Sequence, residues 1–235
     1  MGATVPTGHD GSVLLEEVPP ADSVAREIVA LVERRSLAYQ RHYRCSLKVK
    51  RIWRVCLSAA LQQVNAAAES LGRASWLFHG TSQTAAKCII ENGFQLPTRS
   101  GMFGKGVYFA RCPLKSVGYA RYTSSFTKLR RLFSSKPGPA ADTRVMLVCD
   151  VHLGRSKTLR RAAPYLTSSE QLQPGPLTRL CFPDQKYDSV YVPGGLFCCY
   201  AVNVDEYVIF DPTRAIPRYM LEFEVEPIKL AKASA

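Results

Sequence analysis

The stretch that decides the fold is Gly104-Lys105-Gly106-Val107-Tyr108-Phe109-Ala110, a glycine-rich turn followed by a short apolar run that predicts a β-strand. Two other segments have the same character, Leu77-Phe78-His79-Gly80-Thr81 and Asp205-Glu206-Tyr207-Val208-Ile209-Phe210. Each segment sets one polar side chain in or beside an apolar run. Because strands are rigid supports, the three segments predict a pocket with an imidazole, an aromatic ring and a carboxylate at fixed positions.

The size and composition of the chain indicate a folded domain. Its 235 residues suit one compact domain with a short tail, or at most two small domains. With 46% hydrophobic and 21% charged residues, the chain can bury a sizeable core. Lys and Arg number 31 and Asp and Glu 19, an excess of +12 that is concentrated in residues 121–161. Such a run attracts phosphates, but the absence of a nucleic-acid motif favours a solvated basic face.

The cysteines and the termini indicate an intracellular protein, in the nucleus or the cytoplasm. None of the eight cysteines forms a CxxC pair, and none has the spacing of zinc ligands, so we expect buried thiols and no metal. The adjacent pair Cys198-Cys199 would point to opposite faces of a strand. No signal peptide and no stretch of membrane-spanning length is present in the sequence, so no membrane partner is expected.

The order of the expected elements favours an α+β fold. We expect a flexible leader over residues 1–21, and a helix from Asp22 or Ser23 with a linker over 22–45. Strands are predicted over 47–55, 75–79, 107–110, 145–153, 188–192, 206–210 and 219–225, and helices over 57–71, 84–92 and 113–122. Thr84 is the predicted cap of the second of these helices, and Gly93 ends it. Residues 123–143 and 164–183 are expected to connect elements. Strands outnumber helices, which fall mostly in the first half of the chain.

Together with Met102-Phe103 before the glycine-rich turn and Lys115-Ser116-Val117-Gly118-Tyr119 after it, the three segments resemble a known signature. They look like the His-Tyr-Glu signature of the poly(ADP-ribose) polymerase catalytic domain, one of the diphtheria-toxin-like ADP-ribosyltransferases. The resemblance covers residues 46–227, followed by a short tail over 228–235. It implies an ADP-ribosyltransferase fold with a split mixed β-sheet.

The resemblance also implies the chemistry. NAD would be the co-substrate, without a metal, and cleavage of its nicotinamide–ribose bond passes through an oxocarbenium-like state that a carboxylate stabilises. Glu206 matches the catalytic glutamate. His79 matches the histidine that binds the adenosine ribose, and Gly80 the residue whose backbone binds the nicotinamide carboxamide. Tyr108 and Tyr119 match the tyrosines that flank the nicotinamide ring.

Ser116 is placed to bond the carboxamide, because a helix from Pro113 would put it on the same face as Tyr119. Taken alone, His79 and Tyr119 would be read as structural residues, Ser116 as a solvent hydroxyl and Glu206 as a surface carboxylate. The order and spacing of the segments reverse that interpretation. The helical regulatory domain of the DNA-damage members and the tankyrase zinc cluster are both absent from the expected pattern.

Three functions remain open from the sequence. The first is transfer of ADP-ribose to a protein acceptor, with the chain itself among the candidates, and the short loop between Pro193 and Asn203 favours single or short transfers. The second is an inactive module that binds NAD, ADP-ribose or nucleic acid. The third is a phosphate- or RNA-binding protein that uses residues 121–161, in which case binding would depend steeply on salt.

Overall fold

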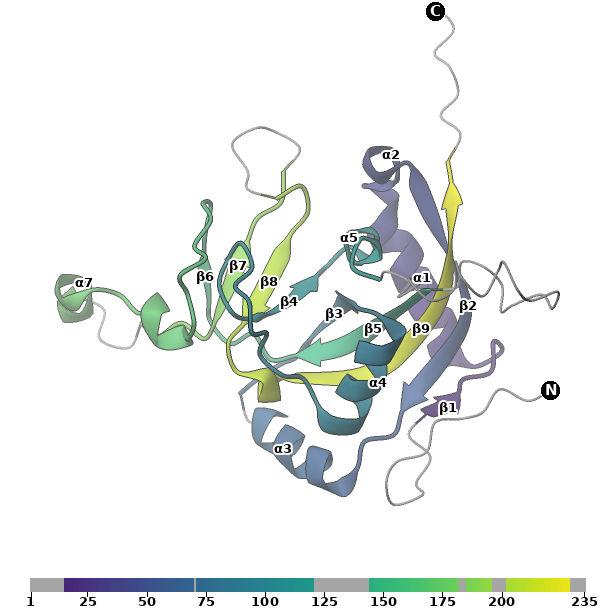
Figure 1. Cartoon of the computed structure of the whole chain (residues 1–235), viewed down its shortest axis with the longest axis horizontal. Coiled ribbons are helices and arrows are strands. Elements are labelled where there is room, and N and C mark those ends of the chain that lie inside the picture. Colours follow the sequence, from purple (N-terminus) through teal and green to yellow (C-terminus); the bar gives the residue numbers. More distant parts are fainter. Residues whose placement is uncertain (1–14, 70, 121–143, 182–184, 196–201, 229–235) are drawn as a thin grey trace, which may run out of the picture.

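The structure is a computed structural model that describes residues 15–69, 71–120, 144–181, 185–195 and 202–228. In these residues the chain forms one sheet with helices on both faces (Figure 1). The strands are β1 (Leu15–Glu17), β2 (Cys45–Val55), β3 (Ser75–Gly80), β4 (Val107–Ala110), β5 (Arg144–Val151), β6 (Ser156–Thr158), β7 (Ser189–Val192), β8 (Glu206–Ile209) and β9 (Ala215–Pro227). The helices are α1 (Ser23–Leu37), α2 (Gln40–Tyr43), α3 (Ala59–Glu69), α4 (Gln83–Asn92), α5 (Pro113–Val117) and α7 (Pro176–Cys181), with 3-10 turns η1 (Ser169–Leu172) and η2 (Pro212–Arg214).

The sheet is split between β3 and β4. Its strand order is β1-β2-β9-β5-β3-β4-β8-β7-β6, and the described neighbours run antiparallel except β6 and β7. β3 pairs with β5 along its whole length, from Ser75 to Gly80, whereas it pairs with β4 only through Phe78 and Ala110. The two halves of the sheet are therefore free to diverge at this point. The predicted α+β class with a mixed sheet is confirmed.

Helix α1 covers one face of the sheet. It begins as predicted, because the Asp22 carboxylate accepts a hydrogen bond from the Val24 N–H at 2.9 Å. Apolar residues three and four positions apart give it one buried face, which includes Ile28 and Val32. That face packs in the same buried cluster as Phe78 and other sheet residues. Although the sequence assigned α1 to a separate segment, it shares the core of the sheet.

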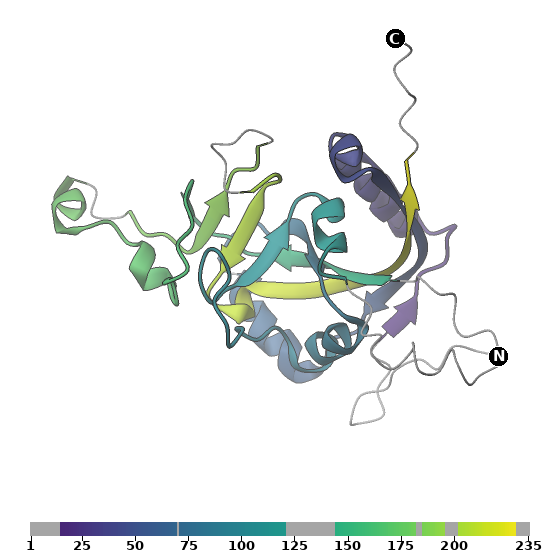
Figure 2. The same ribbon diagram turned by 45° about the horizontal axis from the view of Figure 1, so that its top comes forward.

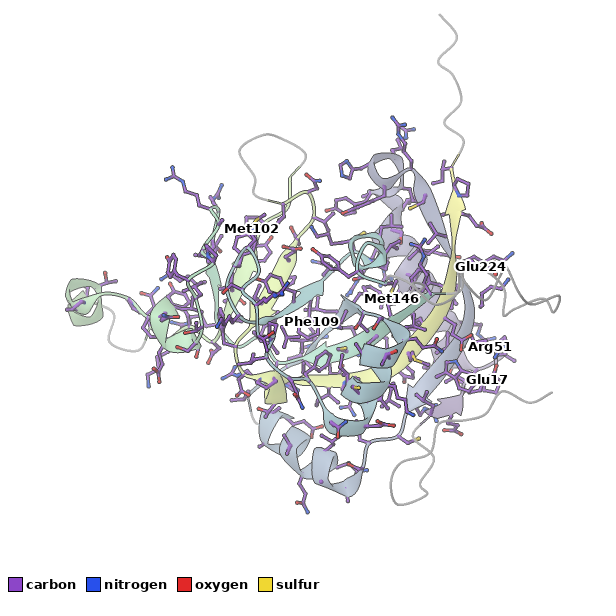
Figure 3. All side chains as sticks on the ribbon, in the orientation of Figure 1. Glu17, Arg51, Met102, Phe109, Met146 and Glu224 are labelled. Atoms are coloured by element: carbon purple, nitrogen blue, oxygen red, sulfur yellow. The ribbon has the colours of Figure 1, made fainter. Side chains whose placement is uncertain are left out.

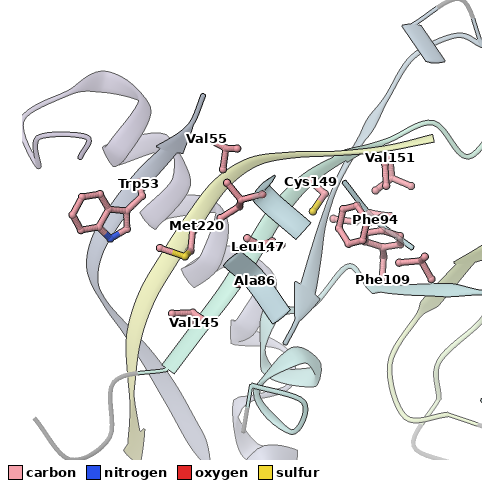
Figure 4. Packing of buried hydrophobic residues seen from close by; sticks show 14 of the residues in the cluster. Trp53, Val55, Ala86, Phe94, Phe109, Val145, Leu147, Cys149, Val151 and Met220 are labelled. Atoms are coloured by element: carbon pink, nitrogen blue, oxygen red, sulfur yellow. The ribbon is translucent and has the colours of Figure 1, made fainter. Parts of the chain in front are cut away.

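Helix α4 covers the opposite face. Its buried residues Ala86 and Ile90 pack in a cluster with Leu147, Cys149 and Phe109 (Figure 4). The prediction of a Thr84 cap is wrong. Ser82, which directly precedes the helix and has the extended backbone that a cap needs, accepts a hydrogen bond from the Ala85 N–H at 3.2 Å. Gly93 ends the helix with a φ of 78°, as predicted.

Part of the expected leader is ordered. β1 pairs antiparallel with β2, with Leu15 opposite Val55. Leu15 and Val18 are buried, so the prediction of a flexible leader is wrong for this stretch. The physical reason is that β2 would otherwise present an unpaired edge, which β1 covers. Residues 1–14 of the expected leader lie outside the described residues.

The remaining differences concern short elements. α5 ends at Val117, five residues earlier than predicted, and the connection 164–183 contains η1 and α7. β6 was not predicted, because its three residues lack an apolar alternation. The other predicted strands and the helix α3 are confirmed within a few residues. The expected loop 123–143, the pair Cys198-Cys199 and residues 229–235 of the expected tail lie outside the described residues.

A ladder of opposite charges links β2 to β9. Lys50 pairs with Glu224 at 3.2 Å, and Arg51 pairs with Glu222 at 3.9 Å. Figure 3 shows Arg51 and Glu224 on this side of the molecule. Exposed pairs contribute only about 0–1 kcal/mol each, so the ladder supports the register of the strands more than the stability of the fold. It also neutralises much of the positive charge on β2.

The two ends of the sheet lie far apart. Both views place β6, β7 and α7 at one end, away from β1, β2 and the α1 side (Figure 2). Among the described helices, none combines the length and the apolar character needed to cross a membrane.

We predict that Ile28→Ala destabilises the whole fold. The Ile28 side chain is 0% exposed between α1 and the sheet, and its truncation leaves a cavity that costs about 2–5 kcal/mol. Urea denaturation followed by fluorescence would measure the loss. Ala30→Ser, on the exposed side of the same helix, is the control and should change stability by about 0.5 kcal/mol or less. An equally small effect of Ile28→Ala would show that α1 is not part of the core.

Candidate active site

A cavity of about 1240 Å³ opens where β3 and β4 diverge. Its walls come from the end of β3, from α4, from the loop before β4, from β4 itself, from α5 and from the residues that precede β8. All six site residues predicted from the sequence line it: His79, Gly80, Tyr108, Ser116, Tyr119 and Glu206. Segments up to 127 residues apart in the chain therefore meet at one site, 206 − 79 = 127.

His79 is held in one orientation by its neighbours. Its Nδ1 lies 2.9 Å from the carbonyl oxygen of Tyr108, so Nδ1 carries the hydrogen and donates it. The ring packs edge-to-face on Phe94 at 5.2 Å. Burial lowers the pKa of His79 below its ordinary value, and the bond to the Tyr108 carbonyl opposes that shift. The imidazole is therefore neutral near pH 7, and Nε2 remains as an acceptor for a hydroxyl group.

Gly80 has a structural reason to be glycine. A Cβ at this position would lie 2.0 Å from the carbonyl oxygen of Ser116. Backbone atoms cannot yield by that amount, so a side chain at Gly80 would push α5 away from β3. The glycine thus lets Ser116, which is 3% exposed, lie directly beside the end of β3.

Tyr108 uses its hydroxyl group to shape the loop before β4. The hydroxyl accepts a hydrogen bond from the Phe103 N–H at 2.9 Å and donates one to the Gly104 carbonyl at 2.9 Å. Burial raises the pKa of Tyr108 to about 12, so the hydroxyl stays protonated at physiological pH. A Cβ at Gly101 would lie 2.5 Å from that hydroxyl. The ring of Tyr108 is what remains to contact a ligand in the cavity.

Ser116 and Tyr119 face the cavity from a turn rather than from one continuous helix. α5 ends at Val117, but the Tyr119 N–H donates to the Ser116 carbonyl at 3.1 Å, which adds a further tight turn. The predicted spacing of three residues therefore still places both beside the cavity. Tyr119 is 64% exposed and lies at its mouth, whereas Ser116 is buried.

Glu206 begins β8 and is held by pairing on both sides, opposite Ala110 of β4 and Val192 of β7. It is 7% exposed, and its Oε1 lies 3.1 Å from the Nζ of Lys115. The cation offsets the cost of burying the carboxylate, which would be several kcal/mol for an unpaired charge. Sequence reasoning missed Lys115. Its place directly before Ser116 in the quoted segment was the signal that could have found it.

A comparison with known protein families identifies the family of this chain. The model of the poly(ADP-ribose) polymerase catalytic domain matches residues 26–225. The chain belongs to the poly(ADP-ribose) polymerase catalytic domain family. The resemblance found in the sequence is thereby confirmed. The match begins within α1, twenty residues before the predicted domain boundary at 46.

The chain is also similar to parts of two named proteins. It is 27% identical over 197 residues to the protein mono-ADP-ribosyltransferase PARP3 of Homo sapiens, which covers 77% of the chain and 34% of that protein. It is 28% identical over 167 residues to poly [ADP-ribose] polymerase 2 of Caenorhabditis elegans, which covers 64% of the chain and 27% of that protein. The chain thus spans about a third or less of the curated relatives it matches.

The segment before Glu206 is also fixed. Asp205 accepts a hydrogen bond from the Gly194 N–H at 2.8 Å. A Cβ at Gly194 would lie 2.3 Å from the carbonyl carbon of Val204, so the two chain segments pack backbone to backbone. Asp205 therefore closes the β7–β8 connection at its base and fixes where Glu206 enters the sheet. Residues 196–201 of this connection lie outside the described residues.

Metal ligands were not expected here. Searching the described residues alone, we find no group of three or more His, Cys, Asp or Glu side chains that could hold an ion. Cys112 and Cys149 are buried thiols, and burial raises the pKa of Cys112 to about 11.

We predict that Lys115→Met is destabilising and that the loss depends on Glu206. Removing the cation leaves a buried carboxylate without its partner, which costs about 3–5 kcal/mol. In a Glu206→Gln background the same change should cost much less, because no charge is left unpaired. A double-mutant cycle by urea denaturation measures the coupling. Equal losses in both backgrounds would contradict the pairing.

We also predict that His79 makes the fold less stable in mild acid. Its folded-state pKa is lowered, so the unfolded chain takes up the proton first, at pH values below about 6.5. The stabilisation from neutral His79 is present above that pH and is lost as the pH falls through the folded-state pKa. The free energy of unfolding of His79→Gln should fall less steeply between pH 7 and 5 than that of the wild type. The exposed His42, changed to Gln, is the control.

Proposed function

We propose that this chain is an NAD-dependent ADP-ribosyltransferase that cleaves the nicotinamide–ribose bond and transfers ADP-ribose to a protein. The observation that carries the proposal is the ion-paired, nearly buried Glu206 in the same cavity as His79, Tyr108 and Ser116. Family membership supports it. The name of the human relative, a protein mono-ADP-ribosyltransferase, supports a protein as the acceptor.

The chemistry follows from where charge develops. As the bond from the ribose C1′ to nicotinamide breaks, nicotinamide leaves with the electron pair and the sugar becomes oxocarbenium-like. A carboxylate such as Glu206 beside the sugar stabilises this state more than it stabilises NAD, and so accelerates the step. The acceptor nucleophile then forms a bond to C1′, and its proton is released. Lys115 positions Glu206 for this role through the contact at 3.1 Å.

We assign the remaining residues to NAD recognition. The backbone of Gly80 and the hydroxyl of Ser116 would bind the carboxamide, while the rings of Tyr108 and Tyr119 flank nicotinamide. Stacking of this kind contributes on the order of 0.5–1.5 kcal/mol beyond burial. The Nε2 of His79, left as an acceptor by the bond of Nδ1 to Tyr108, would accept a hydrogen bond from a ribose hydroxyl.

The product is expected to be a single ADP-ribose or a short chain. The name of the human relative supports this proposal. The name of the nematode relative, a poly [ADP-ribose] polymerase, keeps longer products as the outcome to be tested. The acceptors proposed are proteins, including this chain itself.

Nucleic acid is proposed only as a secondary partner, through the basic residues 121–161. Most of that segment, 121–143, lies outside the described residues. In the described part, Lys157 donates to the Leu172 carbonyl at 2.7 Å, so one of its charges has a structural role. Steep salt dependence of oligonucleotide binding would support this partner.

The test of the main proposal is transfer of label from NAD. We predict that the wild type labels itself or an added protein, and that Glu206→Gln loses about 10²–10³-fold of the rate. Glu69→Gln, an exposed carboxylate on α3, is the matched control and should retain it. Equal labelling by wild type and Glu206→Gln would remove Glu206 from its role. Binding of NAD without nicotinamide release, seen as a shift in Tm alone, would favour the inactive binding module instead.

A further inference from the structure

A short helix, α2, packs near Lys115 and Glu206. α2 lies beside α5 in both views (Figures 1 and 2). Its aromatic residues Tyr39 and Tyr43 pack against the buried cluster of Cys112, Leu114 and Val204. Leu114 directly precedes Lys115, and Val204 lies two residues before Glu206. α2 therefore packs against the elements that carry Lys115 and Glu206, whereas none of the residues that line the cavity belongs to α2.

The charge of Glu206 also reaches α2. Burial is the main cause that raises the pKa of Tyr43, and the charges of Cys112, Glu206 and Tyr119 raise it further. Because α2 packs on residues next to Lys115 and Glu206, a macromolecule that reaches the sugar from that side would lie close to α2.

The outer side of α2 carries positive charge. Arg41 and Arg44 are exposed, and within the described part of the chain neither has an ion-pair partner. The cations of β2 differ, because Lys48, Lys50 and Arg51 all face glutamates of β9. The positive charges of Arg41 and Arg44 are thus available to an acidic partner.

The backbone of Arg44 is strained. Its φ of 53° and ψ of 30° are left-handed, and it is the one non-glycine residue with positive φ among those the structure describes. This conformation costs an L-residue on the order of 1–2 kcal/mol, which a glycine would avoid. The carbonyl of Arg44 accepts a hydrogen bond from the Ile228 N–H at 3.0 Å, which holds the turn. Many helices end on a residue in this conformation, and Arg44 ends α2 in this way.

We propose that Arg41 and Arg44 of α2 bind an acidic segment of the protein acceptor and hold its nucleophile at the Glu206 side of the cavity. The inference rests on the proposed transferase activity and adds the class of acceptor to it. An acidic peptide fits better than nucleic acid. The acceptor proposed above is a protein, and Tyr39 and Tyr43, on which bases could stack, are half-buried in the cluster beneath α2.

The experiment compares three acceptors with labelled NAD. The first is a synthetic peptide with Ser, Cys, Arg and Glu set among aspartates, and the second is the same peptide with lysines in place of the aspartates. The third is a single-stranded oligonucleotide with a 5′-phosphate. The quantity measured is label on the acceptor divided by nicotinamide released, so cleavage of NAD and use of the acceptor are reported separately. We expect the wild type to prefer the aspartate peptide about threefold or more, and to lose that preference in high salt.

The decisive variant is Arg44→Gly. It removes the charge and relieves the left-handed strain, so its Tm should be equal to or higher than that of the wild type. We expect its preference for the aspartate peptide to fall about threefold, and Arg41→Gln to act in the same direction. Arg73→Gly is the matched control: an exposed arginine in the turn between α3 and β3, which should keep the full preference.

The outcomes separate the two proposals. Nicotinamide release with equal labelling of both peptides, or an unchanged preference in Arg44→Gly, overturns the role of α2 but leaves the transferase intact. Preferential labelling of the oligonucleotide overturns it in favour of nucleic acid. Absence of nicotinamide release by the wild type overturns the proposed function and the acceptor class together.

Discussion

Gly80 can lie against the backbone of Ser116 only because it has no side chain, and the arrangement of the cavity depends on this contact. A Cβ would stand 2.0 Å from the Ser116 carbonyl oxygen. Through the contact, the end of β3 is held against α5, so that His79 on β3 and Lys115 on α5 share one cavity. Lys115 in turn reaches Glu206 at the start of β8. One missing methyl group thus allows three elements to meet.

The split in the sheet supplies the space that this contact borders. β3 and β4 share the single pair Phe78 and Ala110, and the cavity opens where they part. The neighbouring strand pairs are complete, so the walls stay rigid although the sheet is open. A buried carboxylate in such a site would be costly without a cation, and Lys115 meets that cost. For the proposed transferase, rigidity and charge pairing together would allow a transition state to be stabilised without large rearrangement.

The sequence predicted much of this arrangement from local pattern. The alternation along β2 and the apolar runs of β3, β4 and β8 indicated their strands correctly, and the six predicted residues line one cavity. Their individual roles remain predictions. Errors occurred where several residues could serve the same local purpose, as when Ser82 rather than Thr84 caps α4. The sequence did not predict that β1 is an ordered strand, because β1 pairs with β2, which is distant in the chain.

The sequence by itself determined which segments supply the walls of the cavity and in what order, because strand periodicity and a short signature are written in consecutive residues. Only the tertiary structure decided which of them touch. Lys115 and Glu206 are 91 residues apart, 206 − 115 = 91. The position of Lys115 next to Ser116 indicates a site residue, but local pattern does not predict its ion pair with Glu206. The same holds for α2, which lies near α5 because Tyr43 packs on the cluster of Leu114 and Val204. Contacts between distant residues depend on how elements pack, which local pattern does not specify.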